Sequence, residues 1–190
     1  MASLRNALAV SLAVALLAVA PATWALDEKE LHLSLYLNQT YSGNGLNQAV
    51  VVDAGLPGSF GNIAVQDWAV VDAEGSDATT VGRAQGIHFK PSGTNDRAWY
   101  ITLTIVFERT RFKGSMLRMM GYVPQDGQWS IFGGTGKLTM ARGVVNHKIV
   151  SQTGGWRLYK IDIRAFYTPM DVSKASSNCD IIRKILAFGA

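Results

Sequence analysis

Apolar and polar residues alternate along much of the chain with a period of two. At residues 31–38 four leucines alternate with histidine, serine, tyrosine and asparagine, and at residues 98–108 isoleucine, leucine and phenylalanine alternate with threonine, valine and glutamate. This alternation predicts strands with two unlike faces. The residues that we expect to be buried together on one side are Leu33, Leu35, Ile101, Leu103 and Ile105.

Further segments have the β-branched and aromatic composition of strands, and glycine-rich or proline-rich turns separate them. These predicted strands are residues 48–53, 63–73, 81–90, 115–123, 128–132, 137–150 and 155–167. No helical period competes with them before residues 180–188. Strands at this spacing predict an all-β sandwich or barrel, and a barrel closes its own edges. Gly82, Ala84 and Gly86 share one face, which either lets a neighbouring strand approach closely or leaves room for a ligand.

The first 25 residues have the pattern of a secretory signal peptide. Arg5 is followed by an almost uninterrupted apolar run at residues 7–20, which Pro21 breaks before Ala25. The alternative is a membrane anchor, but a spanning helix needs about 20 apolar residues. We therefore predict cleavage after Ala25, secretion to the extracellular space, a single β-domain at residues 26–170 and a C-terminal tail at residues 171–190.

Secretion changes the interpretation of two further features. Cys179 is the chain's single cysteine and lies in the predicted tail, either as a free thiol or as an intermolecular link. The chain has one N-glycosylation sequon, NQT at residues 38–40. The parity of the first strand places Asn38 opposite the leucines, so we predict that Asn38 is exposed and carries a glycan.

Composition and charge exclude several classes of protein. Hydrophobic residues make up 48% and charged residues 17% of the chain, which excludes an intrinsically disordered protein. The net charge of +4 is mild and no Lys/Arg stripe is present, so we predict no nucleic-acid binding. A small basic cluster remains, either as a solvated turn or as a contact for acidic polysaccharide. Its members are Arg109, Arg111, Lys113 and Arg118.

Common catalytic and cofactor motifs are not met. The sequence FGGTGK at residues 132–137 resembles a phosphate loop, but Leu138 follows the lysine and Ile131 stands in place of the first glycine. We therefore interpret it as a tight turn between two strands. The three histidines, His32, His88 and His147, have no ligand-spaced partners, so we predict no metal and no cofactor.

Four short blocks together resemble the signature of plant dirigent proteins. They are VGRAQG at residues 81–86, FKGS at 112–115, GGTG at 133–136 and MARG at 140–143. The opening LYLN at residues 35–38 and the closing LYKID at residues 158–162 also fit. The resemblance extends over residues 31–167.

This resemblance implies an eight-stranded antiparallel β-barrel that assembles as a homotrimer in the apoplast. Dirigent proteins bind phenoxy radicals of monolignols such as coniferyl alcohol, which a separate laccase or peroxidase produces. They direct the coupling of these radicals to one enantiomer of a lignan, a product of phenylpropanoid metabolism. Selecting the face of attack requires orientation and no redox activity of the protein's own. In lignan-forming members, a pocket carboxylic acid protonates the intermediate.

The chain departs from the family pattern at the positions that the resemblance assigns to the pocket. Gln39 and Val123 replace two acids, Gly127 falls near the family's pocket arginine, and His88 replaces a tyrosine. We expect a cavity at one mouth of the barrel, lined mainly by apolar and aromatic side chains with a few polar groups. Gln39 and Val123 should border it, with His88 and Asp126 as further candidates. The alternative for Gln39 is that it only satisfies backbone groups at the end of a strand.

Two functions follow from the resemblance and its departures. The first is stereoselective coupling of phenolic radicals other than those of coniferyl alcohol, because an amide cannot replace a proton-donating acid. The second is a non-catalytic apoplastic defence or cell-wall protein that binds phenolics or glycans. We expect little enantiomeric excess with coniferyl alcohol, and no rescue by Gln39→Asp alone.

Overall fold

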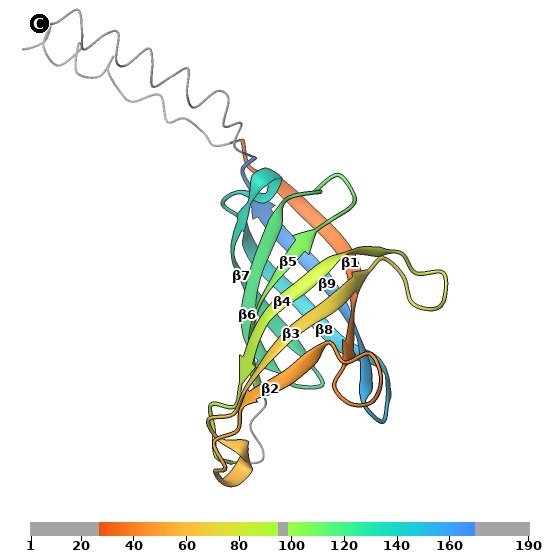
Figure 1. The fold of residues 1–190 in the computed structure, drawn as a ribbon. Coiled ribbons are helices and arrows are strands. Elements are labelled where there is room, and N and C mark those ends of the chain that lie inside the picture. Colours follow the sequence, from red (N-terminus) through yellow and green to blue (C-terminus); the bar gives the residue numbers. More distant parts are fainter. Residues whose placement is uncertain (1–26, 95–98, 170–190) are drawn as a thin grey trace, which may run out of the picture.

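The computed structural model describes residues 27–94 and 99–169, which form nine strands in one antiparallel sheet (Figure 1). The predicted signal peptide, Cys179 and the predicted tail at residues 171–190 lie outside the described residues. The strands are β1 (Lys29–Thr40), β2 (Gln48–Val52), β3 (Ile63–Val71), β4 (Thr80–Phe89), β5 (Trp99–Phe107), β6 (Met116–Val123), β7 (Asp126–Thr135), β8 (Arg142–Thr153) and β9 (Trp156–Tyr167). Two short 3-10 turns are η1 (Pro57–Ser59) and η2 (Gly136–Leu138). No helix within these residues is long and apolar enough to cross a membrane.

The sheet closes into a barrel because β1 pairs with both β9 and β3. Along β3, the last residues pair with β1 and the first residues pair with β2, and both pairings are antiparallel. β1 and β2 therefore run in the same direction and share one position around the barrel, with residues 41–47 as an excursion between them. The nine strands fill eight positions, which confirms the predicted eight-stranded antiparallel barrel.

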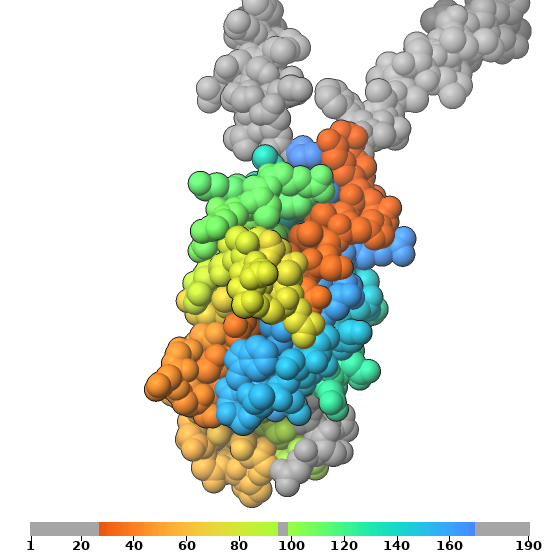
Figure 2. Space-filling model, turned by 90° about the vertical axis from the view of Figure 1, so that its right-hand side faces the viewer, coloured from red at the N-terminus to blue at the C-terminus, as the bar shows by residue number. Residues whose placement is uncertain are grey.

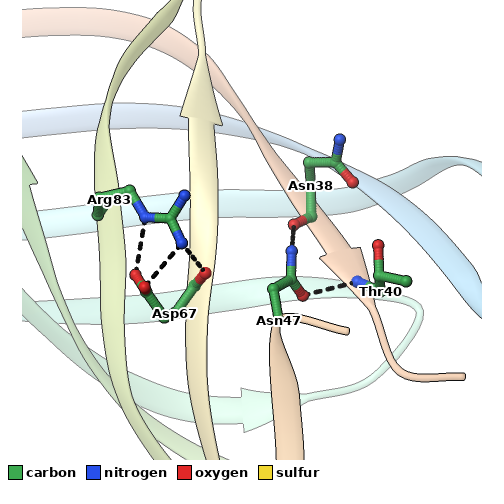
Figure 3. A network of polar contacts seen from close by, with 5 residues as sticks. All are labelled: Asn38, Thr40, Asn47, Asp67 and Arg83. Carbon is green, nitrogen blue, oxygen red and sulfur yellow. Dashed lines mark hydrogen bonds and ion pairs between the residues drawn. The ribbon is translucent and has the colours of Figure 1, made fainter. Parts of the chain in front are cut away.

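Asn47 joins the end of β1 to the start of β2 (Figure 3). Its side-chain amide donates to the Asn38 carbonyl oxygen at 2.8 Å, and its Oδ1 accepts from the Thr40 amide at 2.7 Å. Its backbone N–H donates to the Thr40 carbonyl at 3.1 Å, and its carbonyl accepts from the Asp67 amide on β3 at 2.8 Å. These four hydrogen bonds hold the two strands in line despite the excursion.

Arg83 and Asp67 link β4 to β3 beside this junction (Figure 3). Arg83 Nε donates to Asp67 Oδ1 at 2.8 Å, and Nη2 donates to the Asp67 carbonyl oxygen at 2.6 Å. The hydrogen bond from Arg83 lowers the pKa of the Asp67 carboxyl. Both side chains remain partly in water, so this pair orders the sheet more than it stabilises the fold.

The core lies inside the barrel and consists of the inward side chains of every second strand residue. Of the five residues expected to be buried together, Leu35, Ile101, Leu103 and Ile105 are buried, and Leu33 packs against the core while remaining partly exposed. The prediction of their common face is therefore confirmed. Large side chains that complete the core are Trp68, Phe107, Leu117, Met119, Trp129 and Tyr159.

Glycines on β4 permit an unusually close approach of β5. A Cβ atom at Gly82 would lie 2.3 Å from the Val106 carbonyl oxygen, and one at Gly86 would lie 2.1 Å from the Thr102 carbonyl oxygen. Any side chain at these positions would overlap the neighbouring backbone. Of the two interpretations of this small-residue face, close strand approach is the one that the structure supports.

Two predicted boundaries around the glycine-rich segment were wrong. Gly133 and Gly134 belong to β7, and the turn begins only at Gly136, which has a positive φ of 62°. A Cβ at Gly134 would lie 2.1 Å from the Leu138 carbonyl oxygen, so the strand runs directly beneath the turn. β8 consequently begins at Arg142 rather than at residue 137.

Candidate functional site

A cavity of about 210 Å³ opens at the end of the barrel where β2 lies in Figure 1. Antiparallel strands bring the ends of β1, β4 and β6 to the same rim as the starts of β3, β5 and β9. The described residues that line the cavity are Gln39, Tyr41, Gln48, Val50, Ala64, Trp68, His88, Trp99, Ile101, Val123, Arg157 and Tyr159. No aspartate or glutamate occurs among these lining residues.

Aromatic rings form a continuous wall along the cavity. Tyr159 stacks on Trp68, with ring centroids 5.8 Å apart and planes 8° apart. His88 lies 6.1 Å from Trp68 and meets Trp99 edge to face at 5.1 Å. Burial raises the pKa of the Tyr159 phenol, so this hydroxyl stays protonated. Such a wall offers both faces and edges of rings to an aromatic ligand.

Two glutamines and a tryptophan form a hydrogen-bond network at the rim. Gln39 Nε2 donates to Gln48 Oε1 at 2.7 Å, and Trp68 Nε1 donates to the same oxygen at 3.2 Å. Because the indole N–H can only donate, the Gln48 atom must be the oxygen, and Gln39 must present its nitrogen to it. Gln39 Oε1 is buried and has no hydrogen-bond partner among the described residues.

His88 contributes a neutral imidazole to the cavity. Its Nδ1 is hydrogen-bonded to Gln66 Oε1 on β3. An amide oxygen only accepts, so Nδ1 carries the proton and Nε2 keeps its lone pair. Burial lowers the pKa of His88 to about 4, which keeps the ring uncharged in mildly acidic solution.

Arg157 is the only charged side chain among the described lining residues. It lies directly opposite Gln39 in the pairing of β1 with β9, so both side chains point into the barrel. Its guanidinium carbon lies 4.9 Å from the centroid of the Tyr41 ring. Within the described part of the chain, its Nε has no hydrogen-bond partner and no carboxylate pairs with it.

The structure brings three of the four sequence-based candidates together. Gln39, His88 and Val123 all line the cavity. Asp126 does not, because it begins β7 as an exposed residue. Next to it, a Cβ at Gly127 would lie 3.2 Å from His147 Nε2, so an imidazole fills the space beside that glycine.

The sequence predicted a cavity with mainly apolar and aromatic walls, but it did not identify Arg157, Gln48 or the particular aromatic residues that line the cavity. A signal for Arg157 was present, because it has the same strand parity as the apolar residues Tyr159 and Ile161. A cation on the inward face of a strand indicates a polar site inside a barrel. Nothing local to Gln48 or Trp68 indicated that residues 41–47 would bring these two side chains to Gln39.

Asn38 of the sequon lies on the outer face of the barrel, as predicted, but is half-buried rather than exposed. Its Oδ1 accepts a hydrogen bond from Trp156 Nε1 at 2.5 Å. Figure 2 shows the yellow turn between β3 and β4 on the same face as the blue turn between β8 and β9. Asn38 lines a depression of about 470 Å³ that also contains Glu74 and Gly75 from the first turn and Trp156 at the start of β9.

No group of three or more histidine, cysteine, aspartate or glutamate side chains that could hold a metal occurs in residues 27–94 and 99–169. His147 lies outside the cavity lining, stacked on Trp129 with ring centroids 4.2 Å apart. Both of its ring nitrogens are buried and have no partner among the described residues. Its environment is that of a packed core side chain.

Comparisons with known proteins show similarity in both the fold and the amino-acid sequence. The family model described as "Dirigent-like protein" matches residues 30–166. Dirigent protein 12 of Arabidopsis thaliana is 33% identical over 138 residues, which cover 67% of this chain and 74% of the relative. Pterocarpan synthase 1 of Glycyrrhiza echinata is 29% identical over 153 residues, which cover 74% and 80%. A solved pterocarpan synthase dirigent protein superposes with a TM-score of 0.69 at 26% identity, covering 76% of this chain and 88% of that protein.

Proposed function

We propose, from the premise that this chain belongs to the dirigent family, that its cavity binds a small phenolic radical and directs the stereochemistry of its coupling. The observation that carries this proposal is an aromatic-walled cavity without any carboxyl group among its described lining residues. The aromatic wall suits binding and orientation. The absence of a carboxyl group among the described lining residues argues against acid catalysis by these residues.

The size of the cavity suits one aromatic unit. A cavity of about 150 Å³ holds benzene, so the space of about 210 Å³ found here accommodates one ring with a short side chain. Trp68 and Tyr159 present parallel rings to such a ligand, and Trp99 closes another side. A bound radical then has one face against the protein and one face open to its partner.

The reaction needs no electrons from this protein. A separate one-electron oxidase of the laccase or peroxidase class removes one electron and one proton from each phenol. Two of the resulting radicals then combine to form one covalent bond. Excluding water around the product protects a reactive quinone methide from non-selective attack.

The substrate that we propose is a phenol other than coniferyl alcohol. Gln39 occupies the position of a family acid, and its amide cannot deliver a proton to an intermediate. The Tyr159 phenol is a poor substitute because burial raises its pKa. A relative is named as a pterocarpan synthase, which supports the inference that substrates differ between members of the family.

A second candidate function is binding without catalysis. The same lack of a proton-donating acid favours an apoplastic defence or cell-wall protein that captures phenolics in the cavity. For both functions we propose secretion, which the signal-like pattern of residues 1–25 supports.

An oxidative coupling assay distinguishes the two functions. Coniferyl alcohol and a panel of other phenols are each oxidised by a one-electron oxidant, with and without the protein, and the products are separated by chiral chromatography. We expect enantiomeric excess with at least one other phenol and little with coniferyl alcohol. Racemic products throughout, together with measurable ligand binding, would favour the second function.

A matched pair of variants tests whether the cavity is responsible. Trp99→Ala removes an aromatic wall and should abolish the enantiomeric excess. Phe132→Ala removes an exposed aromatic ring on β7, outside the cavity lining, and should leave the excess unchanged. Equal loss of selectivity in both variants would contradict the assignment of the cavity.

A further inference from the structure

We propose that Gln39 and Arg157 together form a subsite that recognises one hydroxyl group of the aromatic ligand. This inference rests on the proposed function and adds a specificity that the aromatic wall alone does not provide. The two residues lie opposite each other on β1 and β9, and both line the cavity. Gln39 has a buried acceptor and Arg157 a buried donor, and neither atom has a hydrogen-bond partner in the described residues.

The acceptor of this subsite is Gln39 Oε1. Gln39 is only 5% exposed, and its amide nitrogen is already bonded to Gln48 Oε1. Turning the amide over would place two oxygens against each other, because Gln48 Oε1 also accepts from Trp68. The network therefore fixes Gln39 Oε1 as an acceptor that no described residue satisfies.

The donor is Arg157 Nε–H. The atom is buried without a hydrogen-bond partner in the described residues, although the guanidinium packs over Tyr41. A charged donor makes stronger hydrogen bonds than a neutral one, and leaving it unpaired is correspondingly costly. Arg157 and Gln39 do not hydrogen-bond to each other, although they are neighbours in register.

A hydroxyl group that lay between the two atoms would satisfy both at once. It donates its proton to Gln39 Oε1 and accepts from Arg157 Nε–H through a lone pair. An ether or a ketone only accepts, so it would leave Gln39 unpaired. A carboxylate also only accepts and would face the Gln39 oxygen. A site that bonds a ligand hydroxyl discriminates strongly against analogues that lack it.

Binding of three ligands tests this subsite. Coniferyl alcohol is compared with its phenolic methyl ether and with its aliphatic methyl ether, by quenching of tryptophan fluorescence and by calorimetry. We expect the aliphatic methyl ether to bind at least about tenfold more weakly than the parent, because methylation removes the donor that Gln39 requires and a phenoxy radical keeps only its aliphatic hydroxyl. A weaker phenolic ether would instead refute recognition of the aliphatic hydroxyl.

Variants connect this preference to the two side chains. Gln39→Met keeps the length of the side chain without its oxygen, and Arg157→Met removes the donor. Each should reduce the preference for the hydroxyl to less than about threefold. The matched controls Gln128→Met and Arg164→Met alter exposed side chains outside the cavity lining and should retain the preference. Circular dichroism establishes that each variant is folded.

Three outcomes would overturn the proposal. Equal affinity for the parent and both ethers would refute the subsite while leaving the proposed function intact. No binding of any of the three ligands would also refute the subsite, while the proposed function, which concerns phenols other than coniferyl alcohol, would be decided by the coupling assay. A hydrogen bond between Gln39 Oε1 and Arg157 Nε in a crystal structure without ligand would satisfy both atoms, and would refute the subsite alone.

Discussion

At the scale of single residues, burial sets the charge states in and around the cavity. Burial lowers the pKa of both His88 and His147, and it raises the pKa of Tyr159. All three side chains are therefore neutral near pH 7. Arg157 remains the only charge among the described lining residues, so a ligand meets one cation in an otherwise neutral aromatic cavity.

His88 should make the stability of the fold dependent on pH. Its pKa is lowered from 6.5 to about 4, so below about pH 6.5 the unfolded chain binds a proton that the folded chain resists. The free energy of unfolding should thus fall as the pH drops from about 6.5 toward 4. A shift of this size corresponds to a loss on the order of 3 kcal/mol.

Urea unfolding at pH 7 and pH 4 measures this loss. His88→Phe keeps a ring beside Trp99 and should reduce the difference between the two pH values. His32→Phe changes an exposed histidine and should leave most of the difference in place. An unchanged difference in His88→Phe would show that His88 does not cause it.

At the scale of elements, the fit of neighbouring strands depends on a few polar side chains and on glycines, which have no side chain. The close contact of β4 with β5 requires residues without a Cβ. The alignment of β2 with β1 requires the hydrogen bonds of Asn47. Both contacts position strands whose ends form the rim of the cavity.

Gly86→Ala should destabilise the barrel strongly. Its Cβ would lie 2.1 Å from the Thr102 carbonyl oxygen, so β4 and β5 would have to separate. We expect a loss of more than about 2 kcal/mol in the free energy of unfolding. Gly133→Ala is the matched control on β7, where a Cβ meets nothing within 4 Å, and it should change stability by less than about 1 kcal/mol. Similar losses from both substitutions, measured by denaturant titration, would contradict the close-approach argument.

Asn47→Ala should weaken both the fold and ligand binding. It removes two side-chain hydrogen bonds between the start of β2 and the end of β1. We expect a loss of about 1–3 kcal/mol in stability, and weaker ligand binding because Gln48 no longer holds Gln39 firmly. Asn44→Ala alters an exposed residue of the same excursion and serves as the control. Thermal unfolding and ligand titration of the two variants test both expectations. If Asn47→Ala left the ligand affinity unchanged, β2 would not contribute to ligand binding.

At the scale of the whole molecule, one of the eight strand positions of the barrel is occupied by two strands, β1 and β2. β2 pairs with β3, and no other described strand pairs with its second edge. Its apolar side chains Val50, Val51 and Val52 are exposed, as is Leu56 just beyond them. An unpaired edge with exposed apolar residues favours association with another surface.

We expect the chain to sediment as a homotrimer, as its resemblance to dirigent proteins implies, with the β2 edge as a candidate contact. Val51→Lys places a charge on this edge and should shift the sedimentation profile toward the monomer. Ser76→Lys, in the exposed turn between β3 and β4, is the control and should leave the profile unchanged. A monomeric parent chain in sedimentation velocity would refute the trimer.

The sequence by itself determined the parts of this protein that depend on local patterns. The alternation of side chains is set by the geometry of a strand, so the apolar face of residues 98–108 and the inward parity of Gln39 were both predictable. The glycine face of residues 81–86 predicted either a close contact or space for a ligand, and the structure decided for the close contact. The family blocks then identified a closed barrel among the all-β folds.

Only the tertiary structure decided which distant residues share the cavity. Gln48 reaches Gln39 because residues 41–47 leave the sheet and return to the same barrel position, and Arg157 reaches it through the pairing of β1 with β9. Asp126 is excluded because β7 begins earlier than the local pattern indicated. Strand register and closure arise from contacts between residues far apart in the chain, so no local pattern of apolar and polar residues specifies them.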